Sequence, residues 1–588
     1  MLQNNIIIGR IFVVSLACIA LINIQSFFQK PLPFWIHTIL ICITMLSGVF
    51  IYSQKQIVKN TPKLQIQNRH TRLVLITILA GSAVLYLYGL GHYSFQMDEY
   101  YHVAVSKTYF ETGNIFTIGT TPYTRSALTS LITIGSQYIF SNISPNIPIE
   151  FALRFPFALC GLISIFFAFK ISEKITTKSN ALLITLFIAT ETYLMYFFTY
   201  TRFYALSIAL ILAMLYLCIH SKNRGITTFI CILISYTGYL FVSEYFLFIT
   251  CFFALLFVWN FAEKEQKSRL PLIIGAGILA GAILGTLVYR ASIENVYNPF
   301  AWNLNTGTAR NMMYWLYINY GPMLIVLVSI FIGYLSTWKY TLPRLTSQNI
   351  INTYVITNFL FIFIYVVNVP FNFTFRTTLF VLPCIFILYI IYLDKQYIHT
   401  KIGILFIIGL LANNIYMSIR YHADSVGEPY HPTKLVYEKI EIITDTKDLA
   451  RYIASYSETI KKPEAIIYIG LGDTLLRYYL PKQLQDIPIT AFRYSREYDS
   501  RLSDLTSFIE EHKEQNLLVV ISANALPYRR NELYDRIYKK FYVTEANPSL
   551  SSHIKESPYF TKLYTAKDGY SLIYQNNAGY IAPTFSIE

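Results

Sequence analysis

Continuous apolar runs dominate the chain up to about residue 420. Each run is close to the roughly 20 residues that a helix needs to cross a bilayer. Apolar and polar positions do not alternate as they would in a membrane β-barrel. The pattern therefore predicts a polytopic α-helical membrane protein with about thirteen transmembrane helices. The predicted ranges are 6–27, 33–53, 73–93, 151–172, 180–198, 203–220, 226–243, 245–262, 270–289, 323–338, 350–370, 376–393 and 401–418.

Two stretches outside these runs show other patterns. In the loop 94–150, VAVSKTYFE and TRSALTSLITIGSQYIF predict short helices lying along the membrane surface. In the tail 420–588, TKDLARYIASYSETI and SDLTSFIEEHK have helical spacing, whereas AIIYIG and NLLVVISA are typical of strands. The stretch KLYTAKDGYSLIYQ predicts a hairpin with Asp568-Gly569 at its turn. We therefore expect the tail to fold as a small α/β domain.

These patterns divide the chain into three parts. We expect residues 1–72 to contain two N-terminal membrane helices, which the resemblance described below identifies as a two-helix membrane addition, and residues 73–419 to form a transmembrane core that includes the loop 94–150. Residues 420–588 form the α/β domain. The first apolar run is too long for the apolar region of a signal peptide, and no small-residue cleavage pattern follows it, so we interpret it as a retained helix.

Composition agrees with a membrane protein and excludes other classes. Apolar residues make up 54% of the chain and charged residues only 14%, whereas soluble proteins have about 25% charged residues. The net charge of +14 is explained by basic loops, and no basic region with interleaved stacking aromatics occurs, so we expect no nucleic-acid partner. The seven cysteines lie in apolar runs without a C-x-x-C pair, which argues against a disulfide framework or a zinc ribbon.

Basic residues also predict the orientation of the chain. One set of loops is short and rich in Lys and Arg, and the alternating set is longer and poorer in them, so the first set is assigned to the cytoplasm. The loop 94–150, the loop 290–322 and the α/β domain then face the outer side. The basic loops contain Lys55, Lys59, Lys63, Arg69, Arg72, Lys170, Lys174, Lys178, Lys222, Arg224, Lys264, Lys267, Arg269, Lys339, Arg344, Lys395 and Lys401.

Two adjacent acids, Asp98 and Glu99, follow the apolar run 73–93 within the stretch YSFQMDEYYH. One interpretation is structural, because acids favour the first turn of a helix and Asp98 could be a cap. The other is functional, with the pair acting as a general base or metal ligand. His102 lies four residues after Asp98 and would share a helix face with it. An Asp–His pair alone is a weak metal signal, so we predict no metal site and leave open a divalent cation as cofactor.

Isolated arginines stand at the outer ends of the predicted spans. Such residues can extend to lipid headgroups, but their guanidinium groups also bind phosphate in a planar, bidentate manner. Acids beside several such groups suit a hydroxyl nucleophile and a phosphate leaving group. Glu191 is an acid within a predicted span, where it needs a partner or water, and Arg202 is the expected partner. The outer arginines are Arg125, Arg154, Arg202, Arg290 and Arg376.

The order of these motifs resembles that of a known group. MDEYYH after an apolar helix, then LRFPFAL, YTRFYAL and FRTTLFVLPCIF, are similar to motifs of the protein O-mannosyltransferase-like branch of the GT-C glycosyltransferases. Lipid A aminoarabinose transferases belong to the same broad group. The resemblance covers roughly residues 90–220 and 370–390. Two departures are visible: two spans rather than one precede the acidic motif, and TTPYTRSAL has one proline, Pro122, where many relatives have a Pro-Pro-Leu run.

The resemblance implies a GT-C-like fold, in which about eleven of the thirteen predicted spans form the core after a two-helix N-terminal addition, and an inverting transferase. Its donor would be a monosaccharide linked to polyprenyl phosphate in the bilayer, and the sequence contains no convincing nucleotide-binding loop. The acceptor would be a hydroxyl or phosphate of a glycan, lipid or protein on the periplasmic side. The localisation expected is the cell inner membrane, with the active site and the α/β domain facing the periplasm.

The resemblance also implies roles for single residues. Asp98 would take the proton from the acceptor, and Glu99 would orient the acceptor or hold a metal if one is used. Arg202 and Arg376 would neutralise the departing lipid phosphate, with Arg125, Arg154 and Arg290 as further donors. The expected substrate-binding residues are Tyr100, Tyr101, His102, Tyr204 and Glu191.

Three alternatives stay open at the level of sequence. Membrane acids and arginines also occur in transporters and lipid flippases, although no internal repeat or clearly broken helix is visible here. A ligase or polymerase that uses a diphosphate-linked glycan would share the chemistry with a wider donor cleft. A scaffold whose tail binds a partner is the third alternative.

Overall fold

The computed structural model describes a little over half of the chain. The described residues are 68–88, 90–91, 94–243, 245–265, 346–368, 378–396, 411, 445–469, 473–492, 498–512, 514–522, 554–555, 557–566 and 571–577. Predicted spans 6–27, 33–53, 270–289 and 323–338 lie outside them, and of 401–418 only residue 411 is described. Two compact units are present. The first comprises Met1–Leu87, Thr124–Thr129 and Pro156–Ser418, and the second comprises Tyr88–Tyr123, Ser130–Phe155 and Ile419–Glu588.

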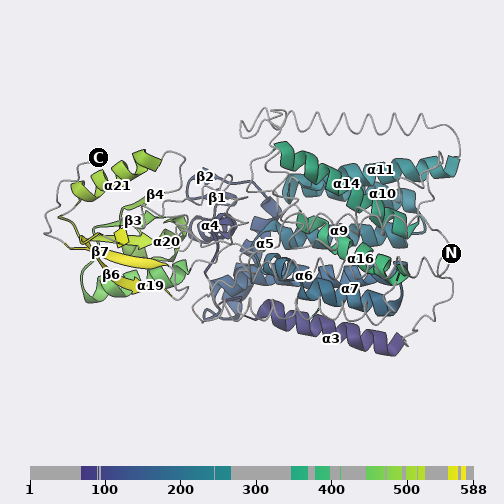
Figure 1. Cartoon of the computed structure of the whole chain (residues 1–588), viewed down its shortest axis with the longest axis horizontal. Helices are drawn as coiled ribbons and strands as arrows, with labels where there is room; N and C mark the ends of the chain where they lie inside the picture. The colour runs from purple at the N-terminus through teal and green to yellow at the C-terminus, as the bar shows by residue number, and fades with distance from the viewer. Residues whose placement is uncertain are drawn as a thin grey trace, which may run out of the picture. The chain divides into compact units, whose positions relative to one another are not determined.

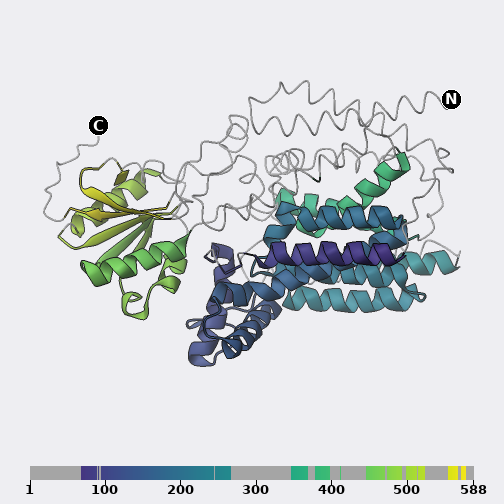
Figure 2. The ribbon, with the colours of Figure 1, turned by 90° about the horizontal axis from the view of Figure 1, so that it is seen from below.

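The first unit is built from long apolar helices that lie side by side (Figures 1 and 2). Four of the described helices are long and apolar enough to cross a membrane: His70–Leu87, Ile149–Ile175, Phe203–His220 and Arg224–Phe241. The chain is therefore a multi-pass helical membrane protein. The helices that belong wholly or mainly to this unit are α3 (Asn68–Leu87), α6 (Ile149–Ile175), α7 (Lys178–Thr190), α8 (Thr192–Phe198), α9 (Phe203–His220), α10 (Arg224–Phe241), α11 (Phe246–Glu265), α14 (Ser347–Asn368), η2 (Thr378–Phe380) and α16 (Leu382–Gln396).

The continuous helix predicted over 180–198 is wrong, because the structure divides this apolar segment into two helices. The sequence predicted a single helix over 180–198, but α7 and α8 meet at a bend of 65°. Glu191 stands at the break with extended backbone, and its Oε2 accepts a hydrogen bond of 2.8 Å from the Leu194 N–H at the start of α8. A carboxylate within an apolar run is stabilised by the unpaired N–H groups of a new helix end. The start of α8 therefore provides a hydrogen bond to the Glu191 carboxylate. In a straight helix this carboxylate would lie in an apolar environment without that donor.

Close approach between helices depends on Gly161 of α6. A Cβ atom added there would lie 2.7 Å from Cβ and Cγ of Phe198, the last residue of α8. No side chain fits at that distance without movement of the neighbour, and Phe198 is fully buried. Helix α8 therefore packs closely against α6 at Gly161, where the absence of a side chain leaves room for Phe198.

We expect Gly161→Ala to destabilise the protein by about 1–3 kcal/mol, because an extra methyl group overpacks this contact. The matched control is Gly81→Ala in α3, where nothing lies within 4 Å of an added Cβ and alanine favours the helix by about 0.5–1 kcal/mol. Thermal unfolding in detergent measures both. A melting temperature of the Gly161 variant at or above that of the control would show that the packing of Phe198 does not require a glycine at this position.

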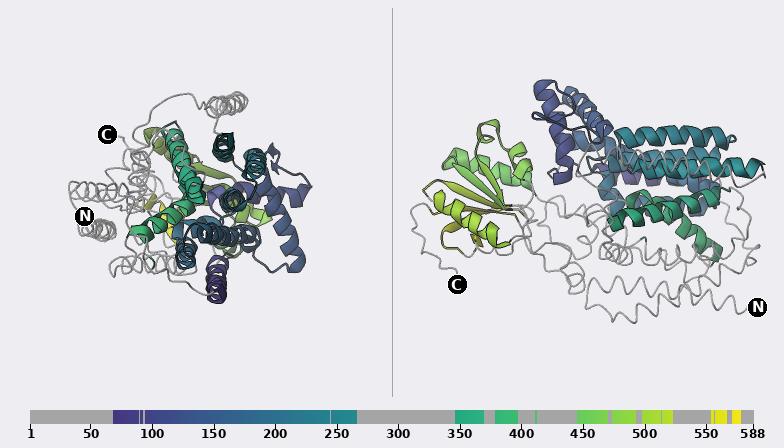
Figure 3. Two further views of the ribbon diagram at one scale, coloured as in Figure 1. Left: turned by 90° about the vertical axis from the view of Figure 1, so that its right-hand side faces the viewer. Right: turned by 90° about the horizontal axis from the view of Figure 1, so that it is seen from above.

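The second unit contains the loop helices and the C-terminal sheet. The loop helices are α4 (Met97–Thr112) and α5 (Ala127–Ile143), joined by a two-stranded ribbon of β1 (Thr117–Ile118) and β2 (Thr121–Pro122). Five strands form one sheet in the order β4-β3-β5-β7-β6 (Figure 3). The strands are β3 (Ala465–Ile469), β4 (Ile489–Phe492), β5 (Leu517–Ile521), β6 (Phe560–Thr565) and β7 (Leu572–Asn576). Strand β3 pairs in parallel with β4 and β5, whereas β7 pairs antiparallel with β5 and β6.

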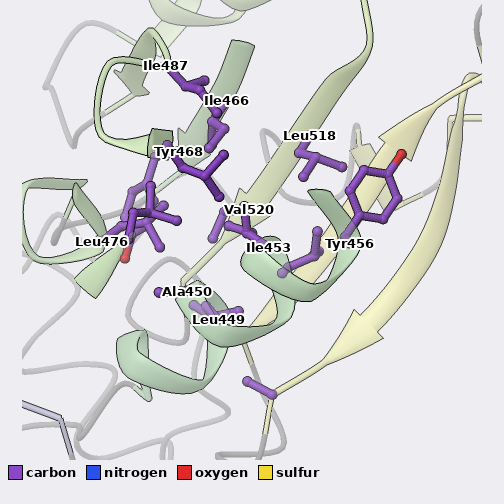
Figure 4. Close-up of a cluster of buried hydrophobic side chains, with 14 residues drawn as sticks. Leu449, Ala450, Ile453, Tyr456, Ile466, Tyr468, Leu476, Ile487, Leu518 and Val520 are labelled. Carbon is purple, nitrogen blue, oxygen red and sulfur yellow. The ribbon is translucent and has the colours of Figure 1, made fainter. Parts of the chain in front are cut away.

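Helices cover both faces of this sheet. Alternate residues of β3 point to opposite sides: Ile466 and Tyr468 pack with Leu449 and Ile453 of α19 (Thr446–Thr459) (Figure 4). The other face packs against α21 (Tyr498–Glu511). A central strand buried on both faces reads as a continuous apolar run, as AIIYI does. The short elements α20 (Asp473–Tyr479) and η3 (Lys482–Leu484) lie in the crossover from β3 to β4.

Candidate active site

The acidic doublet lies in the first turn of α4. The helix begins at Met97, so Asp98 is its second residue, and the side chain of Asp98 lies outside the described part of the structure. Oε2 of Glu99 accepts a hydrogen bond of 2.8 Å from the N–H of Gln96, the N-cap residue. A Glu at the third helical position that reaches back in this way is one half of a capping box. The doublet is thus placed by the start of the helix itself.

Glu99 also forms a buried ion pair with Arg154 of α6. Nε of Arg154 lies 2.9 Å from Oε1 of Glu99, Nη2 lies 2.7 Å from Oε2, and both side chains are fully buried. Nη1 and Nη2 further donate to the carbonyls of Leu90 and Ser94 at 3.0 and 2.9 Å. A charge pair tolerates burial only when its remaining donors and acceptors are satisfied in this way. Arg154 therefore fixes the segment 90–99 at both its backbone and its acid.

Tyr100, Tyr101 and His102, which follow the acidic doublet, form an aromatic group with Tyr123. The ring of Tyr101 stacks on that of Tyr123, with centroids 5.5 Å apart and planes 9° apart, while Tyr100 meets Tyr101 edge-on at 6.1 Å. His102 is buried, meets Tyr123 edge-on, and its Nδ1 lies 3.0 Å from Oγ of Ser130. Burial and the charge of Asp473 raise the pKa of Tyr100 above its usual value. Its hydroxyl is therefore protonated at neutral pH.

The C-terminal domain contacts the segment that precedes the doublet. The N–H of Phe95 donates to the hydroxyl of Tyr479 at 2.8 Å, and the N–H of Thr446 donates to Oγ of Ser94 at 3.2 Å. Phe95 also belongs to an apolar cluster with Leu475 of α20. These contacts come from residues some 350–380 positions later in the chain. The α/β domain therefore helps to hold the loop that presents the acids.

Glu191, Arg202 and Tyr204 are predicted site residues of the first unit that lie in or beside its helices. Glu191 caps α8, and Arg202, 4% exposed, is the N-cap residue of α9. The guanidinium carbon of Arg202 lies 5.6 and 6.0 Å from the ring centres of Phe203 and Tyr204. Tyr204 is buried among aromatic rings, with Phe197 at 4.8 Å. A guanidinium group held beside aromatic rings keeps its charge in a preset position.

Three further arginines, Arg125, Arg290 and Arg376, were also predicted to belong to the site. Arg125 lies just before α5 and is exposed. Arg290 and Arg376 lie outside the described residues. Within the ranges that the structure describes, no three His, Cys, Asp or Glu side chains are grouped so that they could hold a metal ion.

Sequence reasoning missed four contributors to this region: Gln96, Tyr123, Ser130 and Tyr479. For Gln96 only half of the capping-box pattern is present in the sequence, because Glu99 stands at the third helical position but glutamine is not one of the usual N-cap residues. The other three make contacts across long sequence separations and leave no local signal.

No family model matches the chain, and no curated protein matches its sequence. The chain is similar in structure to ArnT from Cupriavidus metallidurans in the apo state, with 13% identity, a TM-score of 0.47, and coverage of 88% of this chain and 100% of that one. The structure of ArnT bound to undecaprenyl phosphate matches with 13% identity and a TM-score of 0.46, over 87% and 99% of the two chains. The oligosaccharyltransferase AglB from Archaeoglobus fulgidus, in complex with an inhibitory peptide and a dolichol-phosphate, matches with 11% identity and a TM-score of 0.40, over 87% and 75%.

ArnT and AglB have the GT-C fold.

Proposed function

We propose that the chain is a membrane glycosyltransferase that moves a monosaccharide from a polyprenyl-phosphate donor to an acceptor hydroxyl or phosphate at the periplasmic side of the cell inner membrane. The observation that supports this most strongly is the first turn of α4. There Glu99 forms a buried ion pair with Arg154. We assign the adjacent acid, Asp98, as the general base.

The proposed step is a single displacement. The acceptor oxygen attacks the anomeric carbon while the bond from that carbon to the phosphate oxygen breaks. The proton of an acceptor hydroxyl passes to Asp98, and the polyprenyl phosphate leaves with its negative charge. A single displacement inverts the anomeric carbon. General base catalysis of this kind contributes about 10²- to 10⁴-fold.

The leaving phosphate needs positive charge, and we assign this role to Arg202 and Arg376. Arg202 has the property required, because its guanidinium is nearly buried beside aromatic rings. Arg125 and Arg290 are further candidates. Arg154 has its donors on Glu99 and two carbonyls, so we assign it to positioning the acidic turn.

The sugar would be held by the aromatic side chains near the doublet. Tyr101, 38% exposed, presents a ring that is already fixed by its stack on Tyr123, and stacking on a fixed ring loses little entropy. Tyr100, His102, Tyr204 and Glu191 are the other residues that we assign to substrate binding.

A transfer assay with purified protein tests the proposal. The protein in lipid nanodiscs is given a polyprenyl-phosphate sugar labelled in the sugar, together with a panel of hydroxyl and phosphate acceptors, and the products are weighed by mass spectrometry. We expect one monosaccharide to be added and free polyprenyl phosphate to accumulate in equal amount. A parallel reaction contains a polyprenyl-diphosphate oligosaccharide instead, and transfer of several sugars from that donor, with none from the monophosphate donor, would contradict the proposal and indicate a ligase or polymerase.

The bend at Glu191 favours a second candidate, a transporter or lipid flippase. Helices broken within the membrane at a charged residue are typical of transporter binding sites, and the 65° bend is such a break. Proteoliposomes distinguish the two functions. Movement of the labelled lipid-linked sugar between leaflets without any covalent product would support the flippase and contradict the transferase.

A further inference from the structure

An open cavity of about 370 Å³ lies in the second unit. Four elements contribute to it: the middle of α4, the start of α6, α19 and α20. Its lining is mostly charged or aromatic, which is unusual for a packing defect. The lining residues are Lys107, Pro148, Ile149, Glu150, Lys447, Tyr478 and Tyr479.

Glu150 is the residue that points to a ligand. Its side chain is fully buried, and Nζ of Lys447 lies 2.7 Å from Oε1. Among the residues that the structure describes, Oε2 has no hydrogen-bond partner. A buried carboxylate oxygen without a donor is costly. An incoming hydroxyl or amine would remove that cost.

The other walls supply positive charge and aromatic surface. Nζ of Lys107 lies 5.0 Å from the ring centre of Tyr478, and the rings of Tyr478 and Tyr479 stand nearly perpendicular, at 87°. Two lysines and one carboxylate thus line the cavity. Burial, and then the charge of Glu150, raises the pKa of both tyrosines well above the usual value, so both hydroxyls keep their protons. The Tyr479 hydroxyl accepts from Phe95 and can donate its own proton.

These groups match a sugar that carries an anionic substituent. Sugar hydroxyls donate to a carboxylate, the apolar face of a sugar ring packs on tyrosine, and a phosphate or carboxylate group pairs with lysine. Lys107 is nine residues after Asp98 in α4, so the two positions are roughly 13 Å apart along the helix axis.

We propose that this cavity binds an anionic sugar unit of the acceptor, one or two units away from the reacting hydroxyl. This inference rests on the proposed function for the role of acceptor, whereas binding itself can be measured without transfer.

The experiment is saturation-transfer NMR on the full chain in lipid nanodiscs, free of sugar-based detergent. The probes are mannose 6-phosphate, mannose and inorganic phosphate. We expect mannose 6-phosphate to bind more tightly than either of the others. Loss of one charge-assisted contact in Glu150→Gln or Lys107→Gln weakens binding by about tenfold or more. The matched control, Glu458→Gln on the exposed side of α19, leaves binding unchanged.

Two variants separate loss of binding in the cavity from misfolding and from loss of sugar transfer. Lys107→Gln leaves the Glu150–Lys447 pair intact, so it reports on the cavity even if Glu150→Gln does not fold. Asp98→Asn should bind mannose 6-phosphate normally, which separates failure of this site from failure of the transferase. The inference is overturned if none of the probes binds, if inorganic phosphate binds as tightly as the sugar phosphate, or if neither cavity variant changes binding.

Discussion

Replacing Asp98 with Asn is expected to reduce transfer by about 10²- to 10⁴-fold while the protein stays folded. Asparagine has nearly the same shape but cannot accept the acceptor proton, so only the proton transfer is removed. The measurement is the initial rate with the labelled lipid-linked sugar, alongside the melting temperature. The matched control is Glu111→Gln, an exposed acid near the end of the same helix, which should keep the full rate. A rate for Asp98→Asn within a few-fold of wild type would remove Asp98 from catalysis.

Breaking the Glu99–Arg154 pair is expected to cost about 3–5 kcal/mol of stability, because each single variant leaves a buried group without its partner. Glu99→Gln removes the carboxylate charge that faces the buried Arg154 guanidinium. Arg154→Met removes two donors from the Glu99 carboxylate and one donor each from the carbonyls of Leu90 and Ser94. Chemical or thermal unfolding of the single variants measures this cost.

The double variant Glu99→Leu with Arg154→Met separates stability from function. Replacing a buried ion pair by apolar residues is often neutral for stability, so we expect much of the lost stability to return. Transfer should stay low, since the turn that presents Asp98 is no longer fixed through Leu90 and Ser94. Full activity of the folded double variant would show that the pair has no positioning role.

The elements that the sequence predicted well are those with a strong local pattern. The span predicted at 203–220 coincides with α9, and AIIYIG and NLLVVISA contain β3 and β5. The hairpin strands β6 and β7 flank the predicted turn, whose residues lie outside the described part. Each of these segments is apolar over its full length or bounded by clear turn residues, so burial and local preference agree.

The elements that were missed are short or depend on distant partners. Helix α20 and strand β4 have only seven and four residues, too few for a periodic signal. The break at Glu191 comes from one acid that needs helix-end donors, and the apolar pattern continues through it. In the candidate site, the sequence identified Glu99 and Arg154 separately. Their pairing spans 55 residues, and no local pattern encodes such a contact.

The most direct test of the account is a cryo-EM structure of the full chain with a non-hydrolysable polyprenyl-phosphate sugar. We predict that the anomeric carbon lies beside the first turn of α4, close enough for Asp98 to reach an attacking hydroxyl, with the phosphate against Arg202 and Arg376. A donor whose phosphate binds elsewhere, with Asp98 far from the sugar, would contradict the proposed transfer reaction.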